Sequence, residues 1–286
     1  MKGIVTVKKA VQSYKEFQLG PIDLSIKEGF ITAVIGRNGA GKTTLLKGIA
    51  HIEPFSAGEV TVANSSYDKD RLHFNRTICY VSEEINMYSD FTVQQSIDFV
   101  SSFYTNWDSD LEQRLLKEFQ LSPKKKIHQL SKGMKLKVNV LLALCFHPKV
   151  LILDEPTAGL DPVARQELLA LLQQWIETGE KTVILSSHIT TDFEQIADYV
   201  MFLRDGQIAL YDDKEKLKDK YLYFTANHHT DLSNARIYGC QKGVYEVTGV
   251  IDSEQENTFD AQLRPATLDE ILYYVVEGGA NDAIFD

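Results

Sequence analysis

The chain has 286 residues, of which 44% are hydrophobic and 24% are charged. This composition is that of an ordinary globular protein, and it excludes collagen-like, disordered and disulfide-scaffold classes. The longest uninterrupted apolar run, residues 140–146, is far shorter than the ~18 residues needed to cross a bilayer. We therefore expect no membrane-spanning segment, and either one large domain or one domain with an appendage.

The net charge and the cysteine content exclude further classes of protein. A net charge of −10 argues against non-specific binding to nucleic acid, which needs a positive field, so we expect no nucleic-acid partner. The 3 cysteines are odd in number and widely spaced, which argues against a disulfide or zinc framework and fits a reducing compartment. Residues 221–286 hold eleven acids and three bases, a net charge of −8, whereas the first 220 residues carry −2. This break predicts one domain over 1–220 and a separate acidic segment over 221–286.

In chain order, the first residues alternate apolar and polar side chains, which predicts a strand and not a signal peptide. Helical spacing over about 84–146 predicts a mostly helical insertion. Residues 199–203 and 207–211 predict a hairpin that turns at Asp205-Gly206. Short apolar runs predict an α/β core with buried parallel strands at 31–35, 150–153 and 182–185, and with a fourth strand at 77–81.

Beyond residue 220 the pattern predicts a small folded α+β appendage. Residues 221–224, 235–238 and 244–251 have the composition of strands. Residues 267–276 have helical spacing, and Thr267 and Glu270 stand at the capping-box spacing. We expect this appendage to have a regulatory or dimer-supporting role, with a purely structural cap as the alternative.

A phosphate-binding loop is predicted by Gly-Arg-Asn-Gly-Ala-Gly-Lys-Thr at 36–43, which matches G-x-x-x-x-G-K-[ST] between an apolar strand and a helix. The glycines let successive N–H groups point inward at a helix N-terminus, whose dipole favours phosphates. Lys42 offers a positive charge to the β and γ phosphates, and Thr43 offers a hydroxyl to Mg²⁺. The predicted nucleotide-binding residues are Gly36, Asn38, Gly39, Ala40, Gly41, Lys42, Thr43 and Thr44.

Two consecutive carboxylates, Asp154 and Glu155, end the apolar strand 150–153. If this strand lies beside the phosphate-loop strand, it delivers both acids to the carboxyl edge of the sheet. We predict that Asp154 belongs to the Mg²⁺ shell and that Glu155 is the general base that polarises the attacking water. Because neighbouring residues on a strand point in opposite directions, we expect the two acids to face different partners.

This ordered set of motifs resembles the ATP-binding cassette (ABC) ATPases, the nucleotide-binding subunits of ABC transporters, over roughly residues 1–215. The most discriminating element is Leu-Ser-Lys-Gly-Met at 130–134, which stands where the family carries L-S-G-G-Q. Ser131 is a good N-cap for the helix expected over 134–146, and Ser131 and Gly133 form an anion site. The resemblance implies a P-loop NTPase core of ABC type with an antiparallel β subdomain. It also implies that this anion site faces the γ-phosphate held by the opposite subunit.

The same resemblance implies roles for further residues. Asp161 stands at the loop that couples the two ATP sites, and His188 resembles the switch histidine that contacts the γ-phosphate. Tyr14 resembles the aromatic residue that stacks on adenine, with Phe17 as a substitute. Glu83 stands where the family usually has a glutamine; its carboxylate can still ligate Mg²⁺, but it adds a negative charge to the site.

The variant signature, Glu83 and the appended segment resemble the branch of bacterial drug, peptide and antibiotic exporters. This implies an ATPase that pairs with a second copy or a paralogue around two Mg-ATP and powers a separate transmembrane permease subunit. Such a subunit is cytoplasmic and lies on the cytoplasmic face of the cell membrane through its permease. Two alternatives stay open, a non-transport ABC ATPase and an ATP-gated regulatory module without turnover. The cargo, and export against import, stay open as well.

Overall fold

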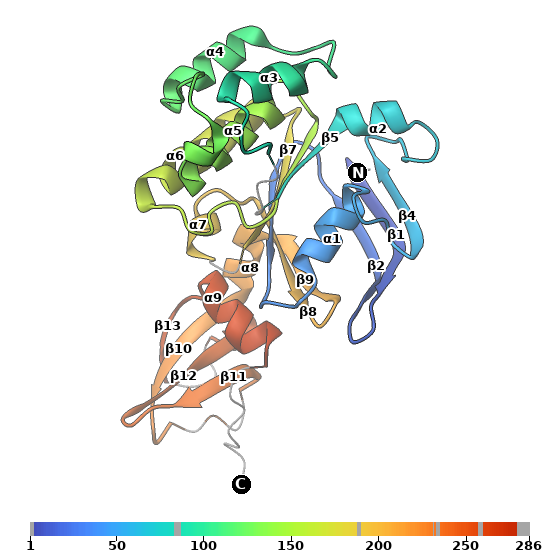
Figure 1. Ribbon diagram of the computed structural model, residues 1–286. Coiled ribbons are helices and arrows are strands. Elements are labelled where there is room, and N and C mark those ends of the chain that lie inside the picture. Colours follow the sequence, from blue (N-terminus) through green and yellow to red (C-terminus); the bar gives the residue numbers. More distant parts are fainter. Residues whose placement is uncertain are drawn as a thin grey trace. The chain divides into compact units, whose positions relative to one another are not determined.

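The computed structural model describes residues 3–82, 87–187, 190–230, 232, 235–256 and 260–278 (Figure 1). Among these residues, no helix is both long and apolar enough to cross a bilayer. The chain forms two compact units. The first comprises Met1–Thr32 and Lys42–Ser187, and the second comprises Ala33–Gly41 and His188–Asp286.

The first unit contains a three-stranded antiparallel sheet in the order β2-β1-β4. The strands are β1 (Val5–Ser13), β2 (Gln18–Ile26) and β4 (Ala57–Val62). Ile22, Leu24 and Ile26 of β2 are buried while the residues between them are exposed, as expected for a sheet with one face on a core. This sheet confirms the antiparallel β subdomain that the resemblance implied.

A second sheet supplies the strand ends on which the candidate site is built. In the first unit it consists of the parallel strands β5 (Ile78–Val81), β6 (Val150–Leu153) and β7 (Thr182–Ser187), with the start of β3 (Ile31–Ile35) beyond β7. Every residue of β6 and β7 is buried, which is typical of strands covered on both faces.

The condition that β6 lies directly beside β3 is not met, because β7 lies between them. Since β6 and β7 are both short, buried and largely aliphatic, the apolar pattern does not show which of them is the neighbour of β3. In the sequence, these strands alternate with the helices α1 (Lys42–Ile49), α2 (Arg71–Thr77) and α6 (Pro162–Ile176).

The helical insertion contains α3 (Val93–Ser101), α4 (Ser109–Glu118), the short 3₁₀ turn η1 (Ile127–Gln129) and α5 (Lys132–Leu144). Thr92 and Gln95 form a capping box at α3, and Asp108 and Ser131 cap α4 and α5. The helix expected from residue 134 therefore begins two residues earlier, directly after its serine cap. Figure 1 shows α3, α4 and α5 gathered together in this unit.

In the second unit, the end of β3 is followed in the sheet by β8 (Tyr199–Arg204) and β9 (Gln207–Asp213). The two last strands pair antiparallel, which confirms the predicted hairpin. Its turn residues Asp205 and Gly206 have φ values of 49° and 75°, the left-handed conformations that a tight two-residue hairpin turn requires. The short helix α7 (Thr191–Glu194) precedes the hairpin, and α8 (Lys214–Lys220) follows it.

After α8 the second unit holds a four-stranded antiparallel sheet in the order β11-β12-β10-β13. Phe224, Val247 and Ile251 belong to the hydrophobic core on one face. Tyr223 lies on the other face, where its ring is 6.2 Å from that of Tyr274. The elements are β10 (Tyr221–Asn227), β11 (Ile237–Lys242), β12 (Glu246–Asp252), the 3₁₀ turn η2 (Ser253–Gln255), β13 (Gln262–Pro265), α9 (Leu268–Glu270) and the π-helical turn η3 (Ile271–Val276).

Two predicted elements of this segment differ from the structure. The strand expected at 235–238 lies at Ile237–Lys242, at the edge of the sheet, where the polar ends of Gln241 and Lys242 contact solvent and obscure the strand pattern. The helix expected over 267–276 begins at its predicted cap, Thr267, but changes from an α-helical turn to a π-helical turn after Glu270.

Candidate functional site

The phosphate-loop residues of the second unit are shaped by their glycines and by the β8–β9 turn. A Cβ atom at Gly36 would lie 2.5 Å from the carbonyl oxygen of Leu203, so only glycine fits there. Gly41 has a φ of 104°, in the region that favours glycine. The backbone N–H of Gly206 donates to the carbonyl of Ala40 over 3.1 Å. The hairpin turn therefore holds the loop in its curved form.

The helix α1 begins at Lys42, immediately after the loop. Its first-turn N–H groups have no partners within the helix, which makes this end suited to phosphate. Thr43 is exposed and Thr44 is half-buried, whereas Lys42 is buried. The hydroxyl of Thr43 is therefore open to a ligand at the position where an Mg²⁺ ligand is predicted.

Lys42 is paired with the second of the two predicted acids. Its Nζ lies 3.3 Å from Oε1 of Glu155, and the two side chains are only 7% and 13% exposed. The pair forms although β7 lies between β6 and β3, because Lys42 belongs to α1 and not to β3 itself. The structure thus brings together the residue expected to bind phosphate and the residue expected to act as base.

Asp154 is 4% exposed, and each of its carboxylate oxygens accepts a hydrogen bond. The Ser186 hydroxyl donates to Oδ1 over 2.6 Å, and the Tyr80 hydroxyl donates to Oδ2 over 2.8 Å. Burial, together with the neighbouring Asp154 charge, raises the pKa of Tyr80, so this hydroxyl stays protonated and continues to donate. Sequence reasoning missed both donors.

Glu155 and Asp154 contact different partners, as predicted, but for a reason that differs from the predicted one. Strand alternation does not apply, because β6 ends at Leu153. Instead Glu155 has a φ of 49°, a left-handed conformation that is uncommon for a residue other than glycine. Its backbone N–H donates to Oγ of Ser186 over 2.9 Å. One serine hydroxyl therefore contacts both acids.

The variant signature lies at the start of α5. The Ser131 hydroxyl accepts a hydrogen bond from the Met134 N–H over 3.2 Å, so it serves as the helix cap. A Cβ at Gly133 would lie 3.3 Å from Leu160, which makes glycine the residue that allows this close approach. The signature residues thus lie close to the loop that leads to Asp161.

Asp161 caps α6. Its Oδ1 accepts hydrogen bonds from the N–H groups of Val163 and Ala164, each over 3.0 Å. The Ala164 contact contributes most to lowering the pKa of Asp161, so the carboxylate is charged at the helix N-terminus. The predicted coupling residue is thus held in one orientation by the helix that follows it.

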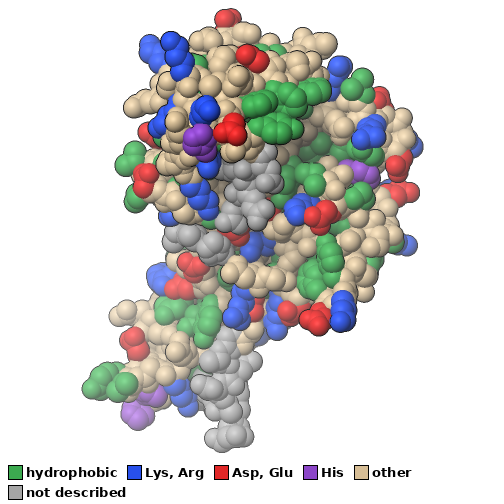
Figure 2. All heavy atoms as spheres, viewed as in Figure 1, with side chains coloured by type: hydrophobic (Ala, Val, Ile, Leu, Met, Phe, Trp, Pro, Cys, Tyr) green, Lys and Arg blue, Asp and Glu red, His purple; other side chains and the backbone are tan. Residues whose placement is uncertain are grey.

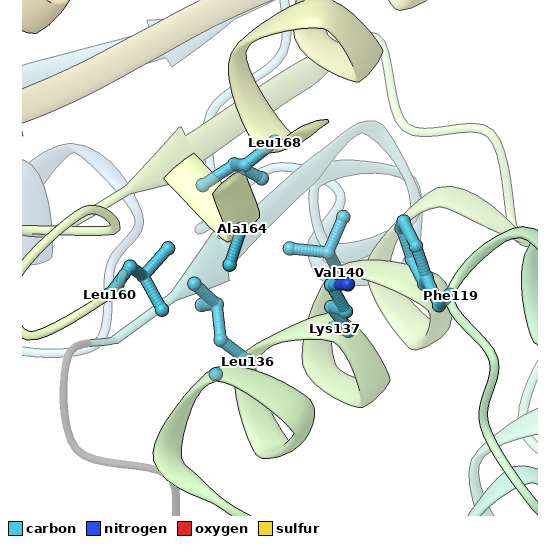
Figure 3. A pocket seen from close by; sticks show the side chains of 8 residues that line it. Phe119, Leu136, Lys137, Val140, Leu160, Ala164 and Leu168 are labelled. Atoms are coloured by element: carbon cyan, nitrogen blue, oxygen red, sulfur yellow. The ribbon is translucent and has the colours of Figure 1, made fainter. Parts of the chain in front are cut away.

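The apolar cavity between α5 and α6 is too small to be the nucleotide site (Figure 3). Its volume is about 10 Å³, at or below what a single water needs. In Figure 3 the side chains of the two helices point toward one another across it. The cavity is therefore a small gap in the packing of α5 against α6. It is lined by Phe119, Gly133, Leu136, Lys137, Val140, Leu160, Ala164 and Leu168.

Tyr14, the predicted adenine-stacking residue, is 46% exposed. Its ring lies 6.3 Å from that of Phe17, and its hydroxyl donates to Glu53 over 3.3 Å. The exposed ring is accessible for stacking, although no contact of the structure assigns it to adenine. Glu83 and His188 lie outside the described residues.

No group of three or more His, Cys, Asp or Glu residues in the described part of the chain gathers to hold a metal ion. Mg²⁺ in phosphate-transfer sites keeps several waters and takes one or two carboxylates together with the substrate phosphates. Asp154 and the hydroxyl of Thr43 are oxygen donors of this kind. The donor set therefore fits a phosphate-bound Mg²⁺.

A glycine-rich loop that opens a helix, together with a lysine paired to the second of two carboxylates after a buried parallel strand, defines a P-loop nucleoside triphosphatase. The family model for "ABC transporter" matches residues 19–158. The chain belongs to this family of ATP-binding, ATP-hydrolysing transporter subunits, and its fold confirms the predicted ABC-type P-loop architecture.

Similar proteins agree with this assignment. The ABC transporter ATP-binding protein YtrB of Bacillus subtilis is 27% identical over 88% of this chain and 88% of that protein. The lantibiotic transport ATP-binding protein SrtF of Streptococcus pyogenes is 30% identical over 76% of this chain and 96% of that protein. A dimeric ATP-binding cassette in a post-hydrolysis state, bound to ADP and Pi, superposes with a TM-score of 0.66 at 25% identity and covers 73% of this chain and 98% of that chain.

Proposed function

We propose that this chain is the ATPase subunit of an exporter for peptide, antibiotic or lipid-like cargo. Two cassettes, either two copies or this chain with a paralogue, close around two Mg-ATP and drive a separate membrane-spanning permease. The observation that carries the proposal is the Lys42–Glu155 pair at the start of α1, together with the signature variant at Ser131 and Gly133. The lantibiotic transport protein SrtF supports the cargo class.

In this proposal the chain's own residues position the γ-phosphate and the attacking water. The loop amides and Lys42 hold the phosphates, while Ser131 and Gly133 of the opposite cassette close the site. Glu155 accepts a proton from the water as it attacks, and His188 contacts the γ-phosphate. Mg²⁺, bound through Thr43, Asp154 and Glu83, would neutralise developing charge on the phosphate oxygens. Hydrolysis then removes a group that both cassettes contact, which favours the open dimer.

An exposed aromatic group on the helical insertion supports the permease partner. We call Tyr88, Phe91, Phe99 and Phe103 the aromatic surface. Tyr88, Phe99 and Phe103 are 63%, 45% and 65% exposed, and neighbouring rings contact one another. Figure 2 shows hydrophobic side chains gathered over the helical insertion. Clustered exposed rings of this kind favour a protein partner with a matching apolar surface.

The permease would place the chain on the cytoplasmic face of the cell membrane. Affinity purification from detergent-solubilised cells, followed by identification of hydrophobic proteins, tests this. We expect the full chain to retain a membrane protein, and the double variant Phe99→Ser/Phe103→Ser to lose it while still binding ATP. Leu72→Ser, at a residue that is 63% exposed on α2, is the matched control.

The alternatives have distinct outcomes in the same experiment. Retention of ribosomal proteins or DNA without a membrane protein supports a non-transport ATPase. ATP binding without turnover, in the purified chain and in its complex, supports a regulatory module. Either result overturns the exporter proposal.

A further inference from the structure

Asp154 is held from both sides by hydroxyl groups of the two strands that flank β6. β5 and β7 pair with β6 in parallel register, with Val81 opposite Leu153 and Leu153 opposite Leu185. Tyr80 reaches the carboxylate from β5, and Ser186 reaches it from β7. The carboxylate therefore cannot rotate without breaking at least one of two short hydrogen bonds.

These two contacts leave acceptor positions of the Asp154 carboxylate for a metal ion. An ionised carboxylate has about four acceptor positions, and the two hydroxyl donors occupy one on each oxygen. The remaining lone pairs are available to Mg²⁺ or to its water. Because each hydroxyl donates its single proton to Asp154, both contacts suit the charged form that a metal requires.

The Ser186 hydroxyl makes a second hydrogen bond. Its oxygen accepts the N–H of Glu155, the residue in the left-handed conformation. The same atom thus fixes the orientation of Asp154 and the backbone position of the predicted base. A purely structural serine on a buried strand needs only one such contact to satisfy its hydroxyl.

We propose that Tyr80 and Ser186 are positioning residues that hold the Asp154 carboxylate in the orientation in which it binds Mg²⁺ or its water. The inference rests on the proposed magnesium site, and it adds two residues that the motifs do not include. Partners that orient a metal ligand through a hydrogen bond typically change metal affinity or activity by about 10- to 100-fold when they are removed.

The test measures magnesium dependence separately from turnover. Binding of a fluorescent ATP analogue to the full chain is followed by anisotropy, first with EDTA and then over a titration with Mg²⁺. Tyr80→Phe and Ser186→Ala each remove one hydroxyl. We expect analogue affinity in EDTA to stay within about twofold of wild type, and the half-saturating Mg²⁺ concentration to rise by about tenfold.

Controls remove comparable hydroxyl groups from residues whose contacts are with groups other than Asp154. Tyr104→Phe changes a tyrosine that stacks on Phe146, and Ser96→Ala changes a buried serine that donates to a helix carbonyl. Both are expected to keep the wild-type Mg²⁺ titration. Far-UV circular dichroism reports whether each variant is folded, and the two site variants test the inference independently of each other.

The outcomes separate this inference from the proposed metal site. If the wild-type chain binds the analogue equally well with and without Mg²⁺, the proposed metal site itself is wrong. If the wild type responds to Mg²⁺ and both site variants give the same titration as the controls, the positioning role of Tyr80 and Ser186 is overturned.

Discussion

The ammonium group of Lys42 and the carboxylate of Glu155 form a nearly buried ion pair at 3.3 Å. Each partner is expected to have another use, since lysine binds phosphate and glutamate accepts a proton from water. A bound γ-phosphate competes with Glu155 for the single ammonium group. Nucleotide binding would thereby loosen the pair and leave Glu155 available to the attacking water.

Glu155→Gln is therefore expected to lower ATP turnover by about 100-fold or more, because the amide cannot act as base. Nucleotide affinity should persist, since the loop and Lys42 remain. The dimer should then stay closed, which size-exclusion chromatography with ATP and Mg²⁺ would detect. Glu167→Gln, at an exposed partner of Lys137, is the control. A monomeric Glu155→Gln that hydrolyses ATP at the wild-type rate would show that this base is misassigned.

The same ion pair predicts a stability effect. Lys42→Met leaves a nearly buried carboxylate without its cation, which we expect to lower the free energy of unfolding by about 3 kcal/mol. Adding Glu155→Gln removes the carboxylate charge, so the double variant should recover a large part of that loss without recovering ATP binding. Chemical unfolding of the four proteins of this cycle measures the coupling. Additive effects of the two changes would contradict a direct interaction.

The sequence predicts best those elements whose structural role depends on a short local pattern of residues. The phosphate loop needs glycine, lysine and threonine at fixed spacing, and the Asp205-Gly206 turn needs left-handed residues. Strand order is different, because β6 and β7 carry similar apolar runs. Only the packing of the whole sheet decides which of them neighbours β3.

The supporting contacts of the candidate site could not be predicted for a related reason. Tyr80 and Ser186 lie far from Asp154 in sequence, and they meet it only because β5 and β7 flank β6. A usable signal is present in the sequence, because polar residues at the carboxyl ends of parallel strands gather at one edge. Ser186 lies within the run Leu-Ser-Ser-His, in which the family resemblance singles out only His188.

The unusual acid at position 83 remains a sequence-based prediction. Glu83→Gln should be tolerated, because it restores the side chain typical of the family and retains an oxygen ligand for Mg²⁺. We expect the change to affect mainly the coupling of ATP hydrolysis to the permease. ATPase assays on the isolated subunit and on the reconstituted complex measure both, and complete loss of activity in the isolated subunit would assign Glu83 a different role.

The appended sheet carries a pH-sensitive contact. Burial alone would raise the pKa of Glu270, but hydrogen bonds from Arg264 and from the Thr267 N–H outweigh it, so the pKa lies below its ordinary value of 4.5. A lowered folded-state pKa contributes stability above 4.5 that is lost as the pH falls through the folded value. We expect Glu270→Gln to reduce this acid-side loss, and exposed Glu254→Gln to leave it unchanged. Thermal unfolding at pH 7 and pH 4 compares the three proteins.

The last prediction concerns residues 221–286, which we propose act on the ATPase core. Arg204, beside the β8–β9 turn, donates to the carbonyl of Val276 at the end of η3 over 2.6 Å. Glu277 lies 3.9 Å from Arg37 of the phosphate loop. The C-terminal end of η3 thus contacts both the β8–β9 turn and the phosphate loop.

Arg204→Ala should therefore change the basal ATPase rate by at least about twofold without abolishing ATP binding, since it removes the hydrogen bond to Val276 but leaves the loop sequence and the Arg37–Glu277 contact intact. Arg236→Ala, at an arginine that packs on Tyr238 within the appended segment, is the matched control. A chain that ends at Lys220 should still bind ATP, but dimerise less readily or hydrolyse at a changed rate. If both Arg204→Ala and the shortened chain hydrolyse ATP and dimerise like the wild type, the appended segment is a structural cap. Its contacts with the loop would then have no effect on the ATPase cycle.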